Sequence, residues 1–202
     1  MAETRVTVRD RGAIPGRVAW AVKIGLVVAF AVAILVPFDH LDGKGMEFRA
    51  PLFALSMLVV PLASRGRLDP PASTADALIV APFLLDTLGN LLGFYDSYSH
   101  TDDVLHAVNW FLLVSAFHAW RFRRVGDNRD ARLIGAGVGA LAIVAWEIGE
   151  WAVSESGAGG GLALTYADTI GDLALSTGAG ILASFAGVAM FGVRTEPESG
   201  DG

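Results

Sequence analysis

Apolar stretches separated by short polar segments run along the whole sequence. Six of them approach the length of a membrane-crossing helix, over about 18–38, 48–63, 77–94, 104–120, 133–153 and 169–193. The hydrocarbon core of a bilayer, about 30 Å thick, is crossed by about 20 helical residues. The pattern therefore predicts an all-α, polytopic membrane bundle of about six transmembrane helices. We expect a single domain over 18–193, between polar tails at 1–17 and 194–202.

Composition agrees with this prediction and narrows the chemistry. Hydrophobic residues make up 53% of the chain and charged residues 18%, whereas soluble domains carry about 25% charged residues. The net charge of -6 argues against a nucleic-acid partner, which would require a basic face. The absence of cysteine excludes disulfides, iron–sulfur clusters and thiolate metal sites. Histidine, carboxylates and hydroxyls are left to carry any chemistry.

The basic residues predict an orientation. If successive loops alternate between the two sides, 13 of the 15 lysines and arginines lie on the side of the termini, and only Lys44 and Arg49 lie on the other. Positively charged loops stay in the cytoplasm. We therefore expect cytoplasmic N- and C-termini and a multi-pass protein of the cell (cytoplasmic or inner) membrane. Lys23, near the start of the first stretch, is expected to snorkel to the headgroups.

Ionisable and amide side chains cluster near one end of the last four stretches. They are Asp86 and Asn90, then Asp102, Asp103, His106 and Asn109, then Glu147 and Glu150, and finally Asp168, Asp172 and Ser176. Because successive helices run in opposite directions, all four sets lie in the outer half of the membrane. Their i,i+3 and i,i+4 spacings place each set on one helix face. No lysine or arginine lies in these stretches, so the sequence predicts an outward-facing acidic pocket without basic partners.

Crowded carboxylates in a low-dielectric site must take up protons, bind a cation or stay hydrated. Facing helices that carry carboxylates and histidine can hold divalent ions, and oxygen-rich sites favour Mg, Mn or Ca. The candidate metal ligands are Glu147, Glu150, Asp172, Asp168 and Asp102. We expect Asp86 and His106 to act as catalytic acid or base groups, and Asn90, Tyr95 and Asn109 to contact a substrate.

The motifs around these residues resemble a known family. They are Asp102-Asp103-Val104-Leu105-His106, Trp146-Glu147-Ile148-Gly149-Glu150-Trp151 and Asp168-Thr169-Ile170-Gly171-Asp172 with Gly178 beyond. They resemble the VanZ-like membrane proteins over about 77–187, and Asp86 with Asn90 is similar to the pattern of the YjdF-type bacterial inner-membrane relatives. Ser176 departs from the family pattern, which has asparagine there. The resemblance implies a multi-helix envelope protein, in one branch linked to glycopeptide-antibiotic resistance, without a settled reaction.

Several functions fit these residues. The first is an envelope enzyme that uses a divalent ion on a lipid or lipid-linked substrate at the outer leaflet. The second is a protein that binds or transports a cation or proton, although no polar path toward the cytoplasm is visible in the sequence. The third is an intramembrane aspartyl protease using Asp86 and Asp172, and the fourth is a polar cluster with a structural role only.

Some of these residues also have structural explanations. Asp102, Asp103 and Asp168 could cap helix N-termini, whereas Glu147 and Glu150 lie at a C-terminal end, where negative charge is unfavourable. His118, beside the arginines, is expected to be solvated or interfacial. Glycines within the stretches are expected to allow close helix packing; they are Gly135, Gly137, Gly139, Gly178, Gly180 and Gly187.

Overall fold

The computed structural model describes residues 4–8, 12–67, 69–121, 125, 127–156 and 164–197. The helices in this part of the chain are α1 (Gly16–Leu35), the 3-10 turn η1 (Asp39–Leu41), α2 (Met46–Ala54), α3 (Ser56–Ala63), α4 (Pro70–Leu91), α5 (Phe94–Ser97), α6 (Thr101–Trp120), α7 (Asn128–Glu155) and α8 (Tyr166–Phe191). Two short strands, β1 (Thr4–Val8) and β2 (Val193–Pro197), flank the helices.

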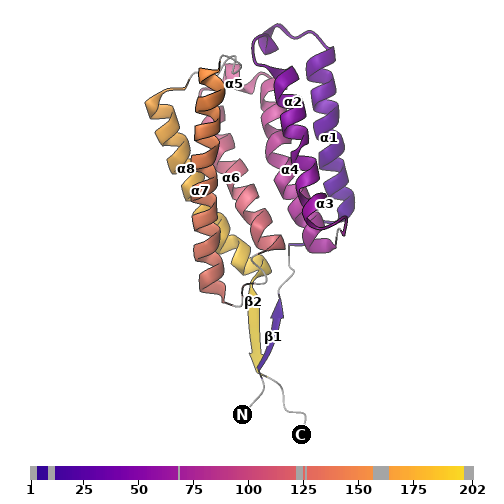
Figure 1. Ribbon diagram of the computed structural model, residues 1–202, viewed down its shortest axis with the longest axis vertical. Helices are drawn as coiled ribbons and strands as arrows, with labels where there is room; N and C mark the ends of the chain where they lie inside the picture. Colours follow the sequence, from indigo (N-terminus) through magenta and orange to yellow (C-terminus); the bar gives the residue numbers. More distant parts are fainter. Residues whose placement is uncertain are drawn as a thin grey trace.

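The long helices run side by side along the bundle (Figure 1). α1 to α4 form one half, α7 and α8 lie in the other, and α6 joins the halves by packing against both α4 and α8. The two strands lie at one end of the bundle, and α2 and α5 lie toward the other. Both described ends of the chain therefore leave the bundle on the same side.

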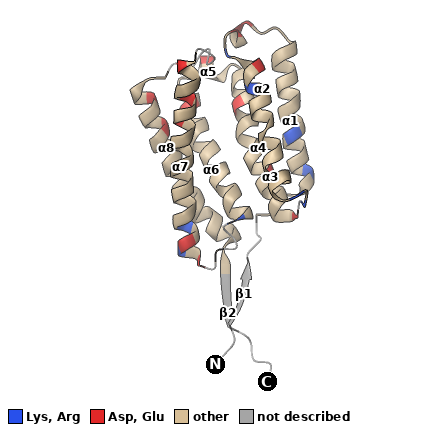
Figure 2. Cartoon of the chain, viewed as in Figure 1, with Lys and Arg blue, Asp and Glu red and all other residues tan. Residues whose placement is uncertain are grey.

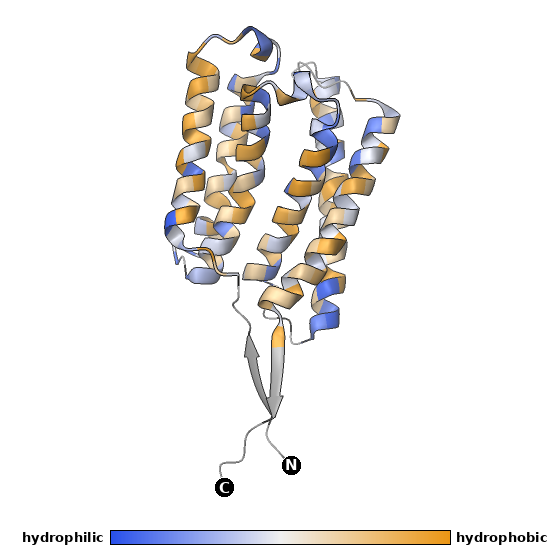
Figure 3. Cartoon of the chain, turned by 180° about the vertical axis from the view of Figure 1, so that it is seen from behind, coloured by the Kyte–Doolittle hydropathy of each residue, from blue (hydrophilic) through white to orange (hydrophobic). Residues whose placement is uncertain are grey.

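Five segments are long and apolar enough to cross a membrane. They are Gly16–Leu35, Met46–Ala63, Pro70–Leu91, Asn128–Glu155 and Tyr166–Phe191. Apolar residues cover the middle of these helices (Figure 3). The prediction of a helical, multi-pass membrane protein is confirmed. α6 is also 20 residues long but less apolar, and it turns much of its surface to α4 and α8 rather than to lipid. A sixth crossing by α6 stays a prediction.

Helix boundaries differ from the predicted ones where proline and capping residues act. α1 ends at Leu35 because the residue before Pro37 favours an extended backbone, and Val36 has φ -101° and ψ 122°. α4 begins at Pro70, well before the predicted start at 77, because the Asp69 carboxylate accepts a hydrogen bond from the Ala72 amide at 3.0 Å. Proline suits the first helical positions, where its missing N–H has no partner to lose.

The predicted helix over 48–63 is divided into α2 and α3, which meet at Leu55. Each contains a proline, Pro51 in α2 and Pro61 in α3. Proline cannot donate to the helical ladder, so both helices lack a backbone hydrogen bond. The short predicted stretch is therefore two consecutive helices and not one continuous helix.

The terminal segments, predicted to be polar tails, contain two strands in their described parts. β1 and β2 pair in an antiparallel two-stranded sheet, with Thr4 opposite Pro197 and Val8 opposite Val193. Their β-branched valines and threonines favour strands. The pairing needs the two ends of the chain to meet, which a reading of local sequence could not reveal.

Lys23 does not snorkel, and that prediction is wrong. Its Nζ lies 2.6 Å from Asp76 Oδ2 on α4, and both residues are buried, at 8% and 1% exposed. A buried ammonium group requires a partner of opposite charge. The early start of α4 supplies that partner, because it places Asp76 inside the helix and against α1.

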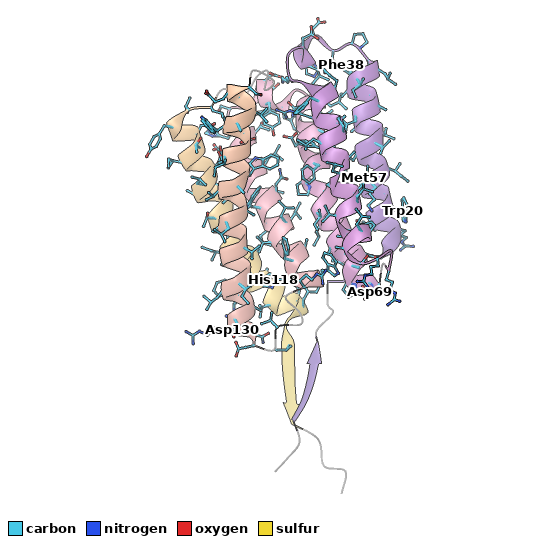
Figure 4. The ribbon with its side chains drawn as sticks, viewed as in Figure 1. Trp20, Phe38, Met57, Asp69, His118 and Asp130 are labelled. Carbon is cyan, nitrogen blue, oxygen red and sulfur yellow. The ribbon has the colours of Figure 1, made fainter. Side chains whose placement is uncertain are left out.

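His118 is buried at 1% exposed, near the end of α6 that faces the strands (Figure 4), so the prediction of a solvated side chain is wrong. It fits beside two glycines, because a Cβ atom on Gly135 or Gly187 would overlap its ring. Close packing is confirmed at these two positions. The prediction of close packing is wrong at Gly137 and Gly178, where an added Cβ would meet no atom within 4 Å.

Candidate functional site

A cavity of about 520 Å³ lies between α2, α4, α5, α6, α7 and α8, at the end of the bundle away from the strands. Acidic residues concentrate at this end (Figure 2). α2 and the segment before it supply the basic residues Lys44 and Arg49, and the other elements supply six carboxylates. Those are Asp86, Asp96, Asp102, Glu150, Asp168 and Asp172.

His106 on α6 lies close to two of these carboxylates. Its Nε2 lies 3.9 Å from Asp102 Oδ1 and 3.8 Å from Asp172 Oδ1. Its Nδ1 is 3.3 Å from the Ser176 hydroxyl, and its ring stacks on Trp110 with the ring centroids 6.5 Å apart. The Trp110 indole N–H donates to the Gly139 carbonyl at 2.9 Å. The imidazole is therefore held from two sides while its Nε2 faces carboxylates.

Two groups of potential metal ligands share this histidine. Asp102, His106 and Asp172 form one, and His106, Glu147 and Glu150 form the other; within each group the ligand atoms lie within 4.8 Å of one another. Carboxylate oxygens with one imidazole suit hard divalent cations. The two groups together can hold one such ion. They can hold two if Asp102 and Asp172 bind one ion and Glu147 and Glu150 bind the other.

Glu147 is a buried member of the acidic cluster. It is 8% exposed, and its Oε1 has no hydrogen-bond partner among the described residues. It lines a second, more open hollow of about 440 Å³ between α7 and α8, and Leu164 lines both this hollow and the main cavity. Buried polar atoms are nearly always hydrogen-bonded. An unpaired carboxylate oxygen beside His106 and Glu150 is what a cation ligand presents in the absence of its ion.

Asp86 has a different environment. It accepts hydrogen bonds from the Tyr95 hydroxyl at 2.7 Å and from Arg49 Nη1 at 3.3 Å, and the Asn90 amide donates to its backbone carbonyl at 3.0 Å. Burial and the Asp86 carboxylate raise the pKa of Tyr95 above its usual range, so the phenol stays protonated and keeps donating.

The prediction that the carboxylates lack basic partners is wrong. Arg49 pairs with Asp86, and Lys44 Nζ lies 2.6 Å from Asp96 Oδ2. The charge pattern predicts both basic residues on the outer side, and in the structure both line the cavity. Sequence reasoning missed their role, and the available signal was that they are the two exceptions to the charge bias of the chain.

The structure brings most of the predicted site residues together. Those that line the cavity are Asp86, Asn90, Tyr95, Asp102, Glu150, Asp168 and Asp172. His106 and Glu147 join them through the ligand groups. Asn109 does not line the cavity, although its Oδ1 is buried without a partner among the described residues. Asp103 turns to His100 instead, with Oδ2 3.0 Å from its Nδ1.

Helix capping does not account for the aspartates at helix starts. α6 begins after His100 without a side-chain cap. α8 is capped by Thr165, whose hydroxyl accepts from the Asp168 amide at 3.1 Å. The carboxylates of Asp102 and Asp168 are therefore free to face the cavity.

Residues 18–192 match the family described as "Predicted membrane protein (DUF2238)". The chain belongs to this family. The match covers all five segments that can cross a membrane apart from the first two residues of α1, in agreement with the helical bundle. No curated protein and no solved structure matches the chain. The DUF2238 match carries no reaction with it, so function rests on the geometry above.

Proposed function

We propose that this DUF2238 protein binds a divalent cation in the acidic cluster and acts on a lipid or lipid-linked substrate in the adjoining cavity. The observation that carries the proposal is the buried, unpaired Glu147 oxygen within reach of His106 and Glu150. A structural cluster would be expected to satisfy that oxygen internally. A cation would satisfy it and also reduce the repulsion between neighbouring carboxylates.

The ligands we propose are Glu147, Glu150, Asp172, Asp102 and His106, with Asp168 close by at the cavity. Oxygen-rich ligation favours Mg, Mn or Ca. Such an ion would supply Lewis-acid activation of a bound oxygen. The cavity volume of about 520 Å³ lies in the range of about 300–1,000 Å³ of small-molecule sites.

We assign Asp86 a positioning role in preference to the acid–base role expected from the sequence. Both oxygens of this carboxylate are already engaged, Oδ1 by the Tyr95 hydroxyl and Oδ2 by Arg49. It instead orients Arg49 toward the cavity. His106, whose Nε2 faces two carboxylates, is placed among the metal ligands in this proposal and not in the acid–base role expected from the sequence.

We further propose six crossings with cytoplasmic termini, so that the cavity opens at the outer leaflet of the cell membrane. The support is the charge bias, with 13 of 15 basic residues assigned to one side, and the position of both strands at the end of the bundle opposite the cavity. The likeness to VanZ-like and YjdF-type envelope proteins points the same way.

A second candidate function, cation or proton transport, has one observation in its favour. Buried polar residues continue toward the strand end of the bundle, in the Lys23–Asp76 pair and in Ser115, His118 and Ser184. The aspartyl protease has less support, because Asp86 is engaged by Arg49 and Tyr95 while Asp172 faces His106.

Metal binding by the purified full chain tests the proposal. Elemental mass spectrometry and Mn²⁺ titration of EDTA-treated protein should detect one or two ions per chain. Glu147→Gln and Asp172→Asn should each weaken Mn²⁺ binding at least tenfold. Asp130→Asn, an exposed carboxylate at the opposite end (Figure 4), is the matched control and should bind like the wild type.

Three results would contradict the proposal. Wild-type protein that neither retains nor takes up a divalent ion would refute the metal site. Glu147→Gln and Asp172→Asn variants that only change the melting temperature would favour a structural cluster. Cation or proton flux into liposomes that is abolished by Asp86→Asn would favour transport.

A further inference from the structure

The two basic residues of the cavity are placed unusually for cations at a membrane surface. Their side chains are largely covered, at 17% exposed for Lys44 and 23% for Arg49. A lysine or arginine near the headgroups would ordinarily extend into water or toward lipid phosphates. Here both side chains line the cavity. They are also the two basic residues that the charge pattern predicts for the outer side of the membrane.

Neither cation uses its full capacity for hydrogen bonds. In the part of the chain that the structure describes, one Arg49 N–H bonds to Asp86, at 3.3 Å. Guanidinium carries five N–H donors in a planar fork suited to bidentate contacts with carboxylate or phosphate. The single long contact leaves most of that fork available. Lys44 likewise places its ammonium against one oxygen of Asp96, although it has three donors.

The opposite side of the cavity complements these cations. Of the six lining carboxylates, two are paired with Lys44 and Arg49, which leaves Asp102, Glu150, Asp168 and Asp172. A divalent ion bound there would present a positive centre facing Arg49 across the same cavity. Mg²⁺ in proteins is usually bound by one or two carboxylates together with substrate phosphates, and arginine frequently binds phosphate through two parallel hydrogen bonds.

Apolar side chains complete the walls. Those that line the cavity with the charged groups are Phe48, Leu52, Phe53, Trp146, Val153 and Leu164. A free phosphate ion would make no use of these contacts. An amphiphile would place its phosphate between the cations and its first hydrocarbon groups against the aromatic and aliphatic residues.

We propose that Lys44 and Arg49 form a phosphate-binding wall, so that the substrate class of this cavity is a lipid with an exposed phosphate group. The inference deepens the proposed function and rests on it for the role of the metal. The wall itself is formed by residues of α2 and the segment before it and needs no ion for its geometry.

Binding of dihexanoyl phosphatidic acid to the full chain in detergent, measured calorimetrically with Mg²⁺ and with EDTA, tests this proposal. We expect Arg49→Gln and Lys44→Gln each to weaken binding at least tenfold. Arg49→Lys should recover only part of the loss, because it keeps the charge without the fork. Arg17 is exposed at the start of α1, at the end of the bundle away from the cavity. The Arg17→Gln variant should therefore bind like the wild type. Inorganic phosphate and dihexanoyl phosphatidylcholine should bind at least tenfold more weakly.

The outcomes separate this inference from the metal site. Wild-type affinity in Arg49→Gln and Lys44→Gln variants that still bind Mn²⁺ would overturn the phosphate wall and leave the metal proposal standing. Absence of phosphatidic acid binding by wild-type protein in both conditions would also overturn it. Arg49-dependent binding in protein that takes up no metal would support the wall and refute the metal site. Inorganic phosphate bound as tightly as the lipid would overturn the lipid assignment.

Discussion

The Lys23–Asp76 ion pair allows a sharp test of how α1 and α4 pack. Lys23→Met removes the ammonium and leaves the Asp76 carboxylate, 1% exposed, without its partner at 2.6 Å. Removing one member of a buried pair costs about 3–5 kcal/mol, and an uncompensated charge inside a bilayer costs about 2.5–3.5 kcal/mol on insertion scales. We therefore expect Lys23→Met to lower the free energy of unfolding by about 3 kcal/mol or more.

The double variant distinguishes lost pairing from lost packing. One oxygen of Asp76 has no hydrogen-bond partner among the described residues, so the pair is incompletely satisfied. Replacing such a pair by apolar residues is often neutral or stabilising. Lys23→Met combined with Asp76→Leu should therefore recover most of the stability lost in Lys23→Met alone, with a coupling energy above about 2 kcal/mol, within the range measured for residues in contact.

Unfolding by sodium dodecyl sulfate in mixed micelles, followed by tryptophan fluorescence, measures these energies. Trp20 is a local reporter, because its ring centroid lies 5.6 Å from Lys23 Nζ. A loss below about 1 kcal/mol in Lys23→Met, the value of an exposed ion pair, would refute the buried pairing and restore the snorkelling lysine. A double variant as unstable as the sum of the single variants would show that packing, rather than charge, is responsible.

Three further outcomes are expected. Gly187→Ala should lower the free energy of unfolding by about 1–3 kcal/mol, because its methyl group would overlap the buried histidine of α6 and overpacking costs that much; Gly137→Ala, with open space around it, should raise it by up to about 1 kcal/mol. Tyr95→Phe should lower stability in detergent by about 1.5–3 kcal/mol, the contribution of a hydrogen bond to a charged group. Because the folded-state pKa of Tyr95 is raised, this contribution to stability should be fully present below about pH 10, the usual tyrosine pKa. It should be lost as the pH rises above that value. A stability difference between wild type and variant that disappears below pH 9 would contradict this assignment. In this cysteine-free chain, a membrane-impermeant thiol reagent applied to intact cells should label Ser99→Cys and spare Arg67→Cys, and the reverse pattern would invert the proposed topology.

Periodic and local features of the sequence were sufficient for the helical membrane bundle. Long apolar stretches have few stable alternatives in a bilayer, where backbone groups must be paired within a helix. The stretches over 133–153 and 169–193 correspond to α7 and α8 with ends shifted by a few residues. The same reasoning brought Asp102, Glu150 and Asp172 to one height, and they line one cavity.

Charge partners were beyond local reasoning. Arg49 and Asp86 are 37 positions apart, and nothing in either segment specifies that α2 bends over the cavity. Local sequence places Lys23 and His118 at the membrane surface, because lipid and water are the only surroundings that it specifies for a single side chain. Both are buried, since Asp76 supplies the opposite charge to Lys23 and two glycines make room for the His118 ring.

By itself the sequence determined the membrane environment, the helix periods and the chemical nature of the site, because hydropathy and i,i+3 or i,i+4 spacing act within one helix. Tertiary structure alone decided which distant segments meet. It paired the two terminal strands, brought Lys23 to Asp76, and placed Lys44 and Arg49 against carboxylates. In a low-dielectric interior a charge is stabilised by the groups a few ångströms away, and those neighbours come from other helices.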